Sequence, residues 1–154
     1  MFQRVDSFAV ERKGELAKLV QDEVAMYEAV GFCQFVFSNG MVPPELLTRM
    51  LYAATGVEEF KSLGHLRLVG ERVFNLEKAF NVREGIGREH DTMPERVLRE
   101  PAPRPPAKGQ VFELERLLED YYKARGWDPR TGRPTCRKLE ELGLKHVADE
   151  LRLE

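Results

Sequence analysis

The sequence predicts an all-α fold: a compact multi-helix domain that contains one irregular, proline-rich segment. Apolar residues recur at helical spacing in several long stretches. No alternating apolar and polar run of strand length occurs in the sequence. At 154 residues the chain is long enough to bury a core of its own. We therefore expect a single helical domain over 1–154, with 94–109 as a Pro-rich connecting segment within it.

The first predicted helix runs from about Phe8 to Val30, with its apolar residues along one side. Those residues are Leu16, Leu19, Val20, Val24 and Tyr27. Gly31 is well placed to end this helix, because glycine adopts the left-handed conformation that follows a last turn. The next residues, Phe32 to Phe37, are too apolar for an ordinary exposed loop, so we expect them to pack against another surface.

The second predicted helix starts at Pro43 or Pro44, since proline suits a first helical turn, and closes at Gly56. The third runs from about Val57 to Phe80. Its apolar residues are expected along one buried side: Phe60, Leu63, Leu66, Val69, Val73, Leu76 and Phe80. Gly64 and Gly70 interrupt this pattern, so each marks either a break or a close helix crossing.

Five prolines between 94 and 106 forbid a continuous helix there, and 101–108 reads as extended chain. A fourth helix is predicted near Val111 to Arg125, closed by Gly126. A short last helix is predicted from Pro134 through Glu141 and ends at Gly143. Tyr121, Tyr122 and Trp127 are expected to form an aromatic cluster that clamps the last helix to the core.

Charge and hydropathy exclude several classes of partner. The net charge is −2, from 24 basic and 26 acidic residues, without a basic block that would neutralise phosphates. Nucleic acid and an anionic membrane surface are therefore not expected as partners. No apolar run has the length of a bilayer span, and the N-terminus lacks a signal-peptide core. Two cysteines make no disulfide framework, so a reducing, cytoplasmic location is expected.

Several blocks of residues, in this order, resemble the C-terminal third of the aldehyde:ferredoxin oxidoreductase family. The blocks are Gln21-Asp22 and Glu28-Ala29-Val30-Gly31-Phe32-Cys33; then Gly70-Glu71-Arg72, Asn75 to Asn81, Arg83-Glu84-Gly85 and Asp91-Thr92-Met93-Pro94; and then Leu118 to Tyr122, Arg125 to Asp128, Gly132 to Thr135 and Leu139 to Leu144. The chain departs from the family's usual pattern with Glu28 for aspartate, Phe32 for leucine and Lys78 for arginine.

The resemblance implies a cofactor role for the residues at the end of the first helix. In the family, the position of Cys33 supplies one thiolate to a [4Fe–4S] cluster, and three further cysteines come from upstream. Glu28, Gly31 and Phe32 would lie, with Cys33, against a pterin that holds tungsten or molybdenum. From the residues alone, a small buried hydrophobe is the favoured interpretation of Cys33. For Glu28, a solvated helix carboxylate is an equally good interpretation.

The other chemically capable residues favour structural roles. Cys136 is expected on a helix face, and His65 and His146 at surface positions. His90 beside Asp91 allows general acid–base chemistry, but a position on a loop over the helices explains it better. A polar series accompanies the third helix: Arg72, Asn75, Asn81, Arg83 and Arg88. Capping and ion pairs with Glu71, Glu77 and Glu84 account for it better than the alternative, a lining for the substrate channel or for the cofactor's phosphates.

Two functional hypotheses follow. The first is a C-terminal domain or split subunit of an enzyme that oxidises an aldehyde to a carboxylate and passes electrons through the cluster to ferredoxin. Its partner would be an upstream pterin-binding domain or subunit, and the isolated chain would be inactive. The second is a truncated, non-catalytic helical interaction module that has lost the cofactor. A chain that stands alone would expose Phe32 to Phe37 or bury them in a homodimer.

Overall fold

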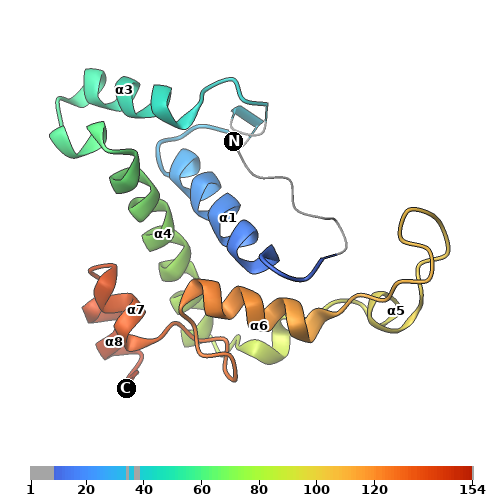
Figure 1. Cartoon of the computed structure of the whole chain (residues 1–154). Coiled ribbons are helices and arrows are strands. Elements are labelled where there is room, and N and C mark those ends of the chain that lie inside the picture. Colours follow the sequence, from blue (N-terminus) through green and yellow to red (C-terminus); the bar gives the residue numbers. More distant parts are fainter. Residues whose placement is uncertain (1–8, 34, 37–38, 154) are drawn as a thin grey trace.

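A computed structural model describes residues 9–33, 35–36 and 39–153, and confirms the predicted all-α class (Figure 1). The longer helices are α1 (Lys13–Ala29), α3 (Pro44–Thr55), α4 (Leu63–Arg83) and α6 (Leu114–Arg125). The shorter ones are η1 (Glu58–Lys61), η2 (Arg88–His90), α5 (Glu95–Arg99), α7 (Cys136–Glu141) and α8 (Lys145–Glu150). Within these ranges, strand-like pairing is limited to one bridge between Trp127 and Pro134. No helix of the described chain is both long and apolar enough to span a bilayer.

Helix α1 is the centre of the fold, because it packs against both α4 and α6 (Figure 1). Two glycines allow these close approaches. A Cβ at Gly70 of α4 would lie 2.0 Å from the carbonyl oxygen of Asp22 in α1. A Cβ at Gly14 of α1 would lie 2.4 Å from the carbonyl carbon of Asp120 in α6. The Gly14 amide also donates to the Asp120 carboxylate at 2.6 Å.

Gly70 therefore lies at a close helix crossing, which is one of the two alternatives that the sequence left open for it. Gly64, in contrast, lies inside α4 without breaking it. The break in the predicted third helix falls at Ser62, whose side chain accepts a hydrogen bond from the His65 amide and so caps α4. Serine at this position satisfies one of the amides that the first turn of a helix leaves without an intrahelical partner.

A buried, charged network joins the three central helices. Arg125 of α6 is 0% exposed, and its Nη1 donates to the Asp22 carboxylate of α1 at 2.5 Å. Its Nη2 donates to Gln21 Oε1 at 2.7 Å. The guanidinium lies 4.0 Å from the ring centre of Phe74 in α4. Because planar guanidinium groups stack on aromatic rings while they donate in their own plane, one side chain ties all three helices together.

Two apolar clusters flank this network. One joins α1, α3 and α4 through buried residues, namely Met26, Tyr27, Leu47 and Leu66. The other docks α7 and α8 onto α4 and consists of Ala79, Leu139, Leu142, Leu144, Val147 and Ala148. Arg72 of α4 adds a hydrogen bond to the Leu142 carbonyl oxygen at 2.8 Å. The α7–α8 unit is therefore anchored to the C-terminal half of α4.

Two sequence predictions about these elements are wrong. Leu76 and Phe80, expected on the buried side of α4, are 46% and 55% exposed, whereas Asn75 and Lys78 are buried. Their polar groups bond to Trp127 and Asp91, and this holds α4 in the observed rotation. The last helix does not end the fold at Gly143 either. Gly143 turns the chain at φ +71°, and α8 follows because its apolar side packs onto the second cluster.

The Gly70→Ala substitution should destabilise the fold strongly. The added methyl group cannot fit 2.0 Å from a backbone oxygen, so α1 and α4 must move apart. A loss of several kcal/mol, on the order of 3, is expected in the free energy of unfolding. Urea denaturation followed by circular dichroism measures it. Gly64→Ala is the matched control in the same helix. Its methyl group meets only Ser62 Oγ at 3.5 Å, so a gain of about 0.5–1 kcal/mol is expected.

The Arg125→Met substitution should cost about 3–5 kcal/mol, because it leaves the Asp22 carboxylate buried beside a weaker partner. Arg96→Met is the control: its pair with Glu100 is 3.9 Å long between side chains 81% and 70% exposed, so a change of about 0–1 kcal/mol is expected. Adding Asp22→Leu to Arg125→Met should recover part of the lost stability. Equal stabilities of the Arg125→Met and wild-type chains would contradict the central role of this network.

Candidate functional site

The candidate site is the end of α1 and the turn after it, residues Glu28–Cys33, here called the α1 loop. The Gly31 amide donates to the Glu28 carbonyl oxygen at 2.9 Å, and the Phe32 amide donates to the Tyr27 carbonyl oxygen at 3.0 Å. This pair of bonds is the Schellman helix-ending motif, and its usual apolar contact is present between the rings of Phe32 and Tyr27, 6.5 Å apart.

Gly31 is required in this motif by its backbone conformation. Its φ is +84°, in the left-handed region that side chains with a Cβ rarely adopt. The space beside it is open, since no atom of the described residues, apart from its two chain neighbours, lies within 4 Å of a Cβ built there. The glycine therefore leaves one face of the α1 loop accessible to a bound group.

Cys33 follows directly and carries an exposed, free thiol. Its carbonyl oxygen accepts a hydrogen bond from the Val36 amide at 2.9 Å, which fixes the local backbone. Phe32 is half-buried, Phe35 is 65% exposed and Val36 is half-buried. Of the apolar run from Phe32 to Phe37, predicted to pack against another surface, Phe32 does so within this chain and Phe35 does not. Residues 34 and 37 lie outside the described residues.

The α1 loop presents hydrogen-bond acceptors rather than donors. Glu28 is exposed, and its carboxylate makes no hydrogen bond or ion pair with the described residues. The last turn of α1 contains no basic side chain to offset the partial negative charge of the helix end. Such a surface suits a ring that offers N–H donors, as pterins do, and disfavours a phosphate.

The described residues can supply one ligand of an iron–sulfur cluster, the Cys33 thiolate, and no more. Among the residues whose positions are described, no group of three or more His, Cys, Asp or Glu side chains is placed to hold a metal ion. An iron–sulfur cluster usually takes four thiolates. Cys33 can therefore serve as a ligand only alongside cysteines from another stretch of polypeptide.

The remaining cysteine and the histidines lie apart from the α1 loop. Cys136 is half-buried in the first turn of α7 and packs against the α7–α8 cluster, in agreement with a helix-face position. His90 is exposed in η2, where its Nδ1 accepts from the Gly87 amide at 3.3 Å. His146 is exposed, whereas His65 is half-buried near Phe60 and not fully at the surface.

The polar series of α4 is largely structural, though its partners differ from those predicted. Arg83 does pair with Glu84, at 3.2 Å. Arg88 instead pairs with Glu115 of α6 at 2.5 Å, and Asn75 accepts from the Trp127 indole at 2.8 Å. The predicted aromatic cluster is present. It joins α6 to Phe74 of α4, while α7 and α8 are held by their own apolar contacts.

One convergence of polar groups escaped the sequence analysis. Lys78 of α4 lies 3.0 Å from the Asp91 carboxylate, and the Tyr122 hydroxyl of α6 donates to the same carboxylate. Burial, followed by the hydrogen bond to Asp91 and then by the charge of that carboxylate, raises the pKa of Tyr122 well above its ordinary value. The three residues come from distant points of the chain and form no linear motif. In the sequence, the only feature that singles them out is that they lie in the blocks that resemble the aldehyde:ferredoxin oxidoreductase family.

The structure thus defines an all-α domain with an exposed Gly-Phe-Cys turn at the end of its central helix. A family model described as "Aldehyde ferredoxin oxidoreductase, domains 2 & 3" matches residues 1–144, and the chain belongs to this family. The resemblance noted from the sequence is therefore confirmed. The chain is similar to the tungsten-containing aldehyde ferredoxin oxidoreductases of Pyrococcus horikoshii, with 39% identity over 136 residues, and of Thermococcus kodakarensis, with 38% identity over 135 residues.

These matches cover most of this chain but only a fraction of each relative. They include 88% and 87% of the chain and 22% of each relative's length. A solved active-site complex, BamBC of benzoyl coenzyme A reductase with 1,5-dienoyl-CoA, has the same fold. Its TM-score is 0.72, at 22% identity, over 95% of this chain and 21% of that one. The chain therefore corresponds to about a fifth of the proteins it matches.

The two thiols should differ in reactivity. Cys33 is exposed and Cys136 is half-buried, so a disulfide reagent added to the native chain at neutral pH should modify Cys33 first. Stopped-flow absorbance should show a fast and a slow phase of equal size. Cys33→Ser should remove the fast phase and Cys136→Ser the slow one. A fast phase that survives Cys33→Ser would contradict the exposed position of this thiol.

Proposed function

We propose that this chain is the C-terminal helical part, as a domain or a split subunit, of an aldehyde:ferredoxin oxidoreductase. In this proposal Cys33 supplies one thiolate to a [4Fe–4S] cluster, and Glu28 and Gly31 contact the pterin that carries tungsten or molybdenum. The remaining thiolates and the rest of the pterin site come from an upstream domain or subunit. The electrons leave through the cluster to ferredoxin.

The observation that carries the proposal is the exposure of the Cys33 thiol on a turn fixed by Gly31. A cysteine that served only as a small hydrophobe would lie in one of the two apolar clusters, and Cys33 lies in neither. Membership of the family and the small fraction of the relatives that the chain spans support a role as one part of a larger enzyme.

The overall reaction converts an aldehyde and water into a carboxylate, three protons and two electrons. The metal–pterin group, when bound, supplies the transfer of oxygen to the carbonyl carbon and accepts the two electrons. The residues of this chain bind and position the pterin and the cluster. Glu28 accepts hydrogen bonds from ring N–H groups, Gly31 lets the ring approach the backbone, and Cys33 fixes the cluster beside them. Because Glu28, Gly31 and Cys33 lie on one short turn, a pterin and a cluster held by these residues would be close to each other.

A non-catalytic interaction module is the second candidate, and one observation favours it. The Arg125 network and both apolar clusters contain neither Cys33 nor Glu28, so the domain does not need these two side chains or a cofactor in order to fold. Exposed apolar residues near the loop, such as Phe35 and Met41, would then serve as a partner surface. Iron and tungsten or molybdenum in a complex purified with a cysteine-rich subunit would exclude this candidate.

The Cys33→Ala substitution tests the leading proposal in a complex that contains this chain and its upstream partner. Loss of one thiolate should abolish or strongly reduce the electron paramagnetic resonance signal of the reduced cluster. Iron content should fall in parallel. Cys136→Ser is the matched control and should leave signal and iron unchanged, because Cys136 packs against α7 and α8. An unaltered cluster signal in Cys33→Ala would rule out the ligand role.

A further inference from the structure

Helix α3 is apolar around almost its whole circumference but is fully buried on one side only. Among its residues, Glu45 and Arg49 alone are charged. Leu47 and Thr48 are buried, and Leu51 packs against the same apolar cluster as Leu47. A helix that is apolar all round is normally buried all round. The outer side of α3 is therefore an apolar surface that the described residues leave uncovered.

The uncovered side carries a row of exposed apolar side chains, here called the α3 stripe: Leu46, Met50, Ala53 and Ala54. These positions are spaced i, i+4, i+7 and i+8, so they lie on one face of the helix. Leu46 is 37% exposed and Met50 is 42% exposed. Figure 1 shows α3 at an edge of the molecule, at the opposite end of α4 from α7 and α8. The stripe can therefore meet another molecule while the described helices keep their places.

The two charges of α3 make the border of the stripe self-complementary. Glu45 and Arg49 are both exposed, and neither forms an ion pair with the described residues. They are four residues apart, so they lie on the same flank of the helix. When two copies of a helix pair antiparallel about a twofold axis, equal flanks face each other and run in opposite directions. Glu45 of each copy then lies beside Arg49 of the other.

The apolar stripe and the charges agree on one register for this pairing. With the twofold axis midway between Leu46 and Met50, Leu46 of each copy lies opposite Met50 of the other. Glu45 and the Arg49 of the other copy are then offset by two positions, which is about 3 Å along the helix axis. The long side chains span this offset. A single arrangement therefore satisfies both the apolar contacts and the charges.

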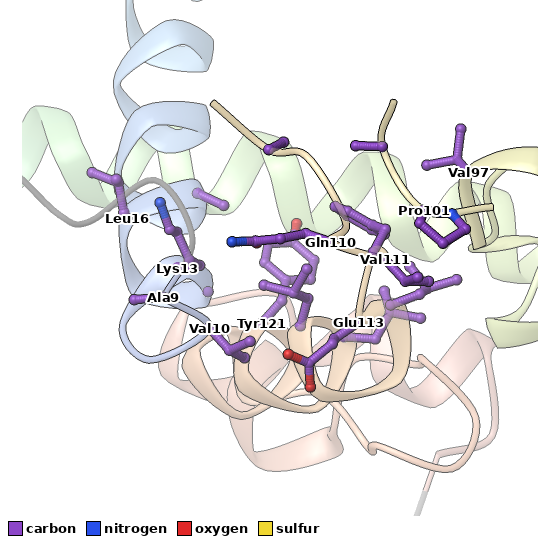
Figure 2. Close-up of a pocket in the computed structure, with 18 of the residues that line it drawn as sticks. Ala9, Val10, Lys13, Leu16, Val97, Pro101, Gln110, Val111, Glu113 and Tyr121 are labelled. Carbon is purple, nitrogen blue, oxygen red and sulfur yellow. The ribbon is translucent and has the colours of Figure 1, made fainter. Parts of the chain in front are cut away.

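A second apolar surface of the molecule does not have this property. It lines a cavity of about 1080 Å³ whose walls come from α1, α6 and the proline-rich segment (Figure 2). A twofold interface brings the same patch of both copies together. Two concave patches leave a void between them, whereas two convex helix faces can pack. The α3 stripe is therefore the better candidate for contact between identical chains.

We propose that the α3 stripe is a homodimer interface, in which two copies of α3 pair antiparallel about a twofold axis. Leu46 and Met50 form its apolar centre, and the two pairs of Glu45 with Arg49 fix the register. One helix from each copy buries less than a standard interface, so the dissociation constant is on the order of 10–100 μM. This goes beyond the proposed function, because no residue of the α1 loop takes part and no cofactor is needed.

Sedimentation velocity on the full chain, over concentrations that bracket this dissociation constant, should show a sedimentation coefficient that rises with concentration. Met50→Asp should weaken association at least about a hundredfold, because each half of the interface would then bury an unpaired carboxylate. Val111→Asp is the matched control. Val111 is also 42% exposed but lines the cavity in Figure 2, so dimerisation should be unchanged.

Charge reversal gives a second test, which a folding defect cannot imitate. Glu45→Arg and Arg49→Glu should each weaken the homodimer about tenfold, because both attractive contacts become repulsive. A mixture of the two variants should associate as strongly as the wild-type chain, since every acid again faces a base in the heterodimer. A fluorescent label on one variant distinguishes the heterodimer from the homodimers, and circular dichroism checks that each variant is folded.

Several results would overturn the proposal. A chain that stays monomeric at every concentration would assign the α3 stripe to a different polypeptide. A dimer that survives Met50→Asp but dissociates with Val111→Asp or Phe35→Asp would place the contact at the cavity or near the α1 loop. Charge variants that fail to associate when mixed would contradict the pairing. If Met50→Asp fails to fold, the charge variants still decide. None of these measurements involves the cluster, so failure here leaves the proposal for Cys33 intact.

Discussion

The buried ion pair between Arg125 and Asp22 is the constraint on which the rest of the structure depends. A buried charge is tolerated only when its partners satisfy it, and Arg125 has oxygen acceptors at Asp22 and Gln21 and an aromatic face at Phe74. These partners lie on α1 and α4, so a single side chain of α6 fixes three helices against one another. Such a network contributes more to a unique arrangement of the helices than to the net free energy of folding. Well-packed apolar residues of equal volume would fill the same space with similar stability.

The all-α class and the longer helices follow from the sequence because local signals decide them. Gly31, Pro44 and Gly56 act on their own backbone, so the ends of α1 and α3 were predictable within a few residues. The rotation of α4 was not predictable. Its burial is decided by Trp127 and Asp91, which are remote in sequence, and periodicity alone assigns Leu76 rather than Asn75 to the core. Helix α8 was not predicted for a related reason. A glycine such as Gly143 indicates where a helix ends, but it does not indicate whether another helix follows.

The candidate site was also predictable from the sequence only in part. The turn at Gly31 and Cys33 is a local motif, so its geometry could be anticipated, and the resemblance to a family gave it a chemical meaning. The meeting of Lys78, Asp91 and Tyr122 could not be anticipated, because it requires α4 and α6 to pack together on α1. Sequence patterns report what one element does by itself. Sites assembled across elements become visible only when the tertiary contacts are known.

The position of the α1 loop follows from the role of α1 in the fold. The first two-thirds of this helix are locked by Gly14, Asp22 and the crossing at Gly70, so the helix acts as a rigid rod. Its last turn is held by Met26 and Tyr27, which are buried in the cluster with α3 and α4, and it is followed by a turn with a defined hydrogen-bond pattern. A ligand that must meet atoms from another polypeptide has to be both exposed and fixed, and ordinary loops provide only the first property. A thiol at the end of a clamped helix provides both, and it needs no cofactor to hold its own domain together.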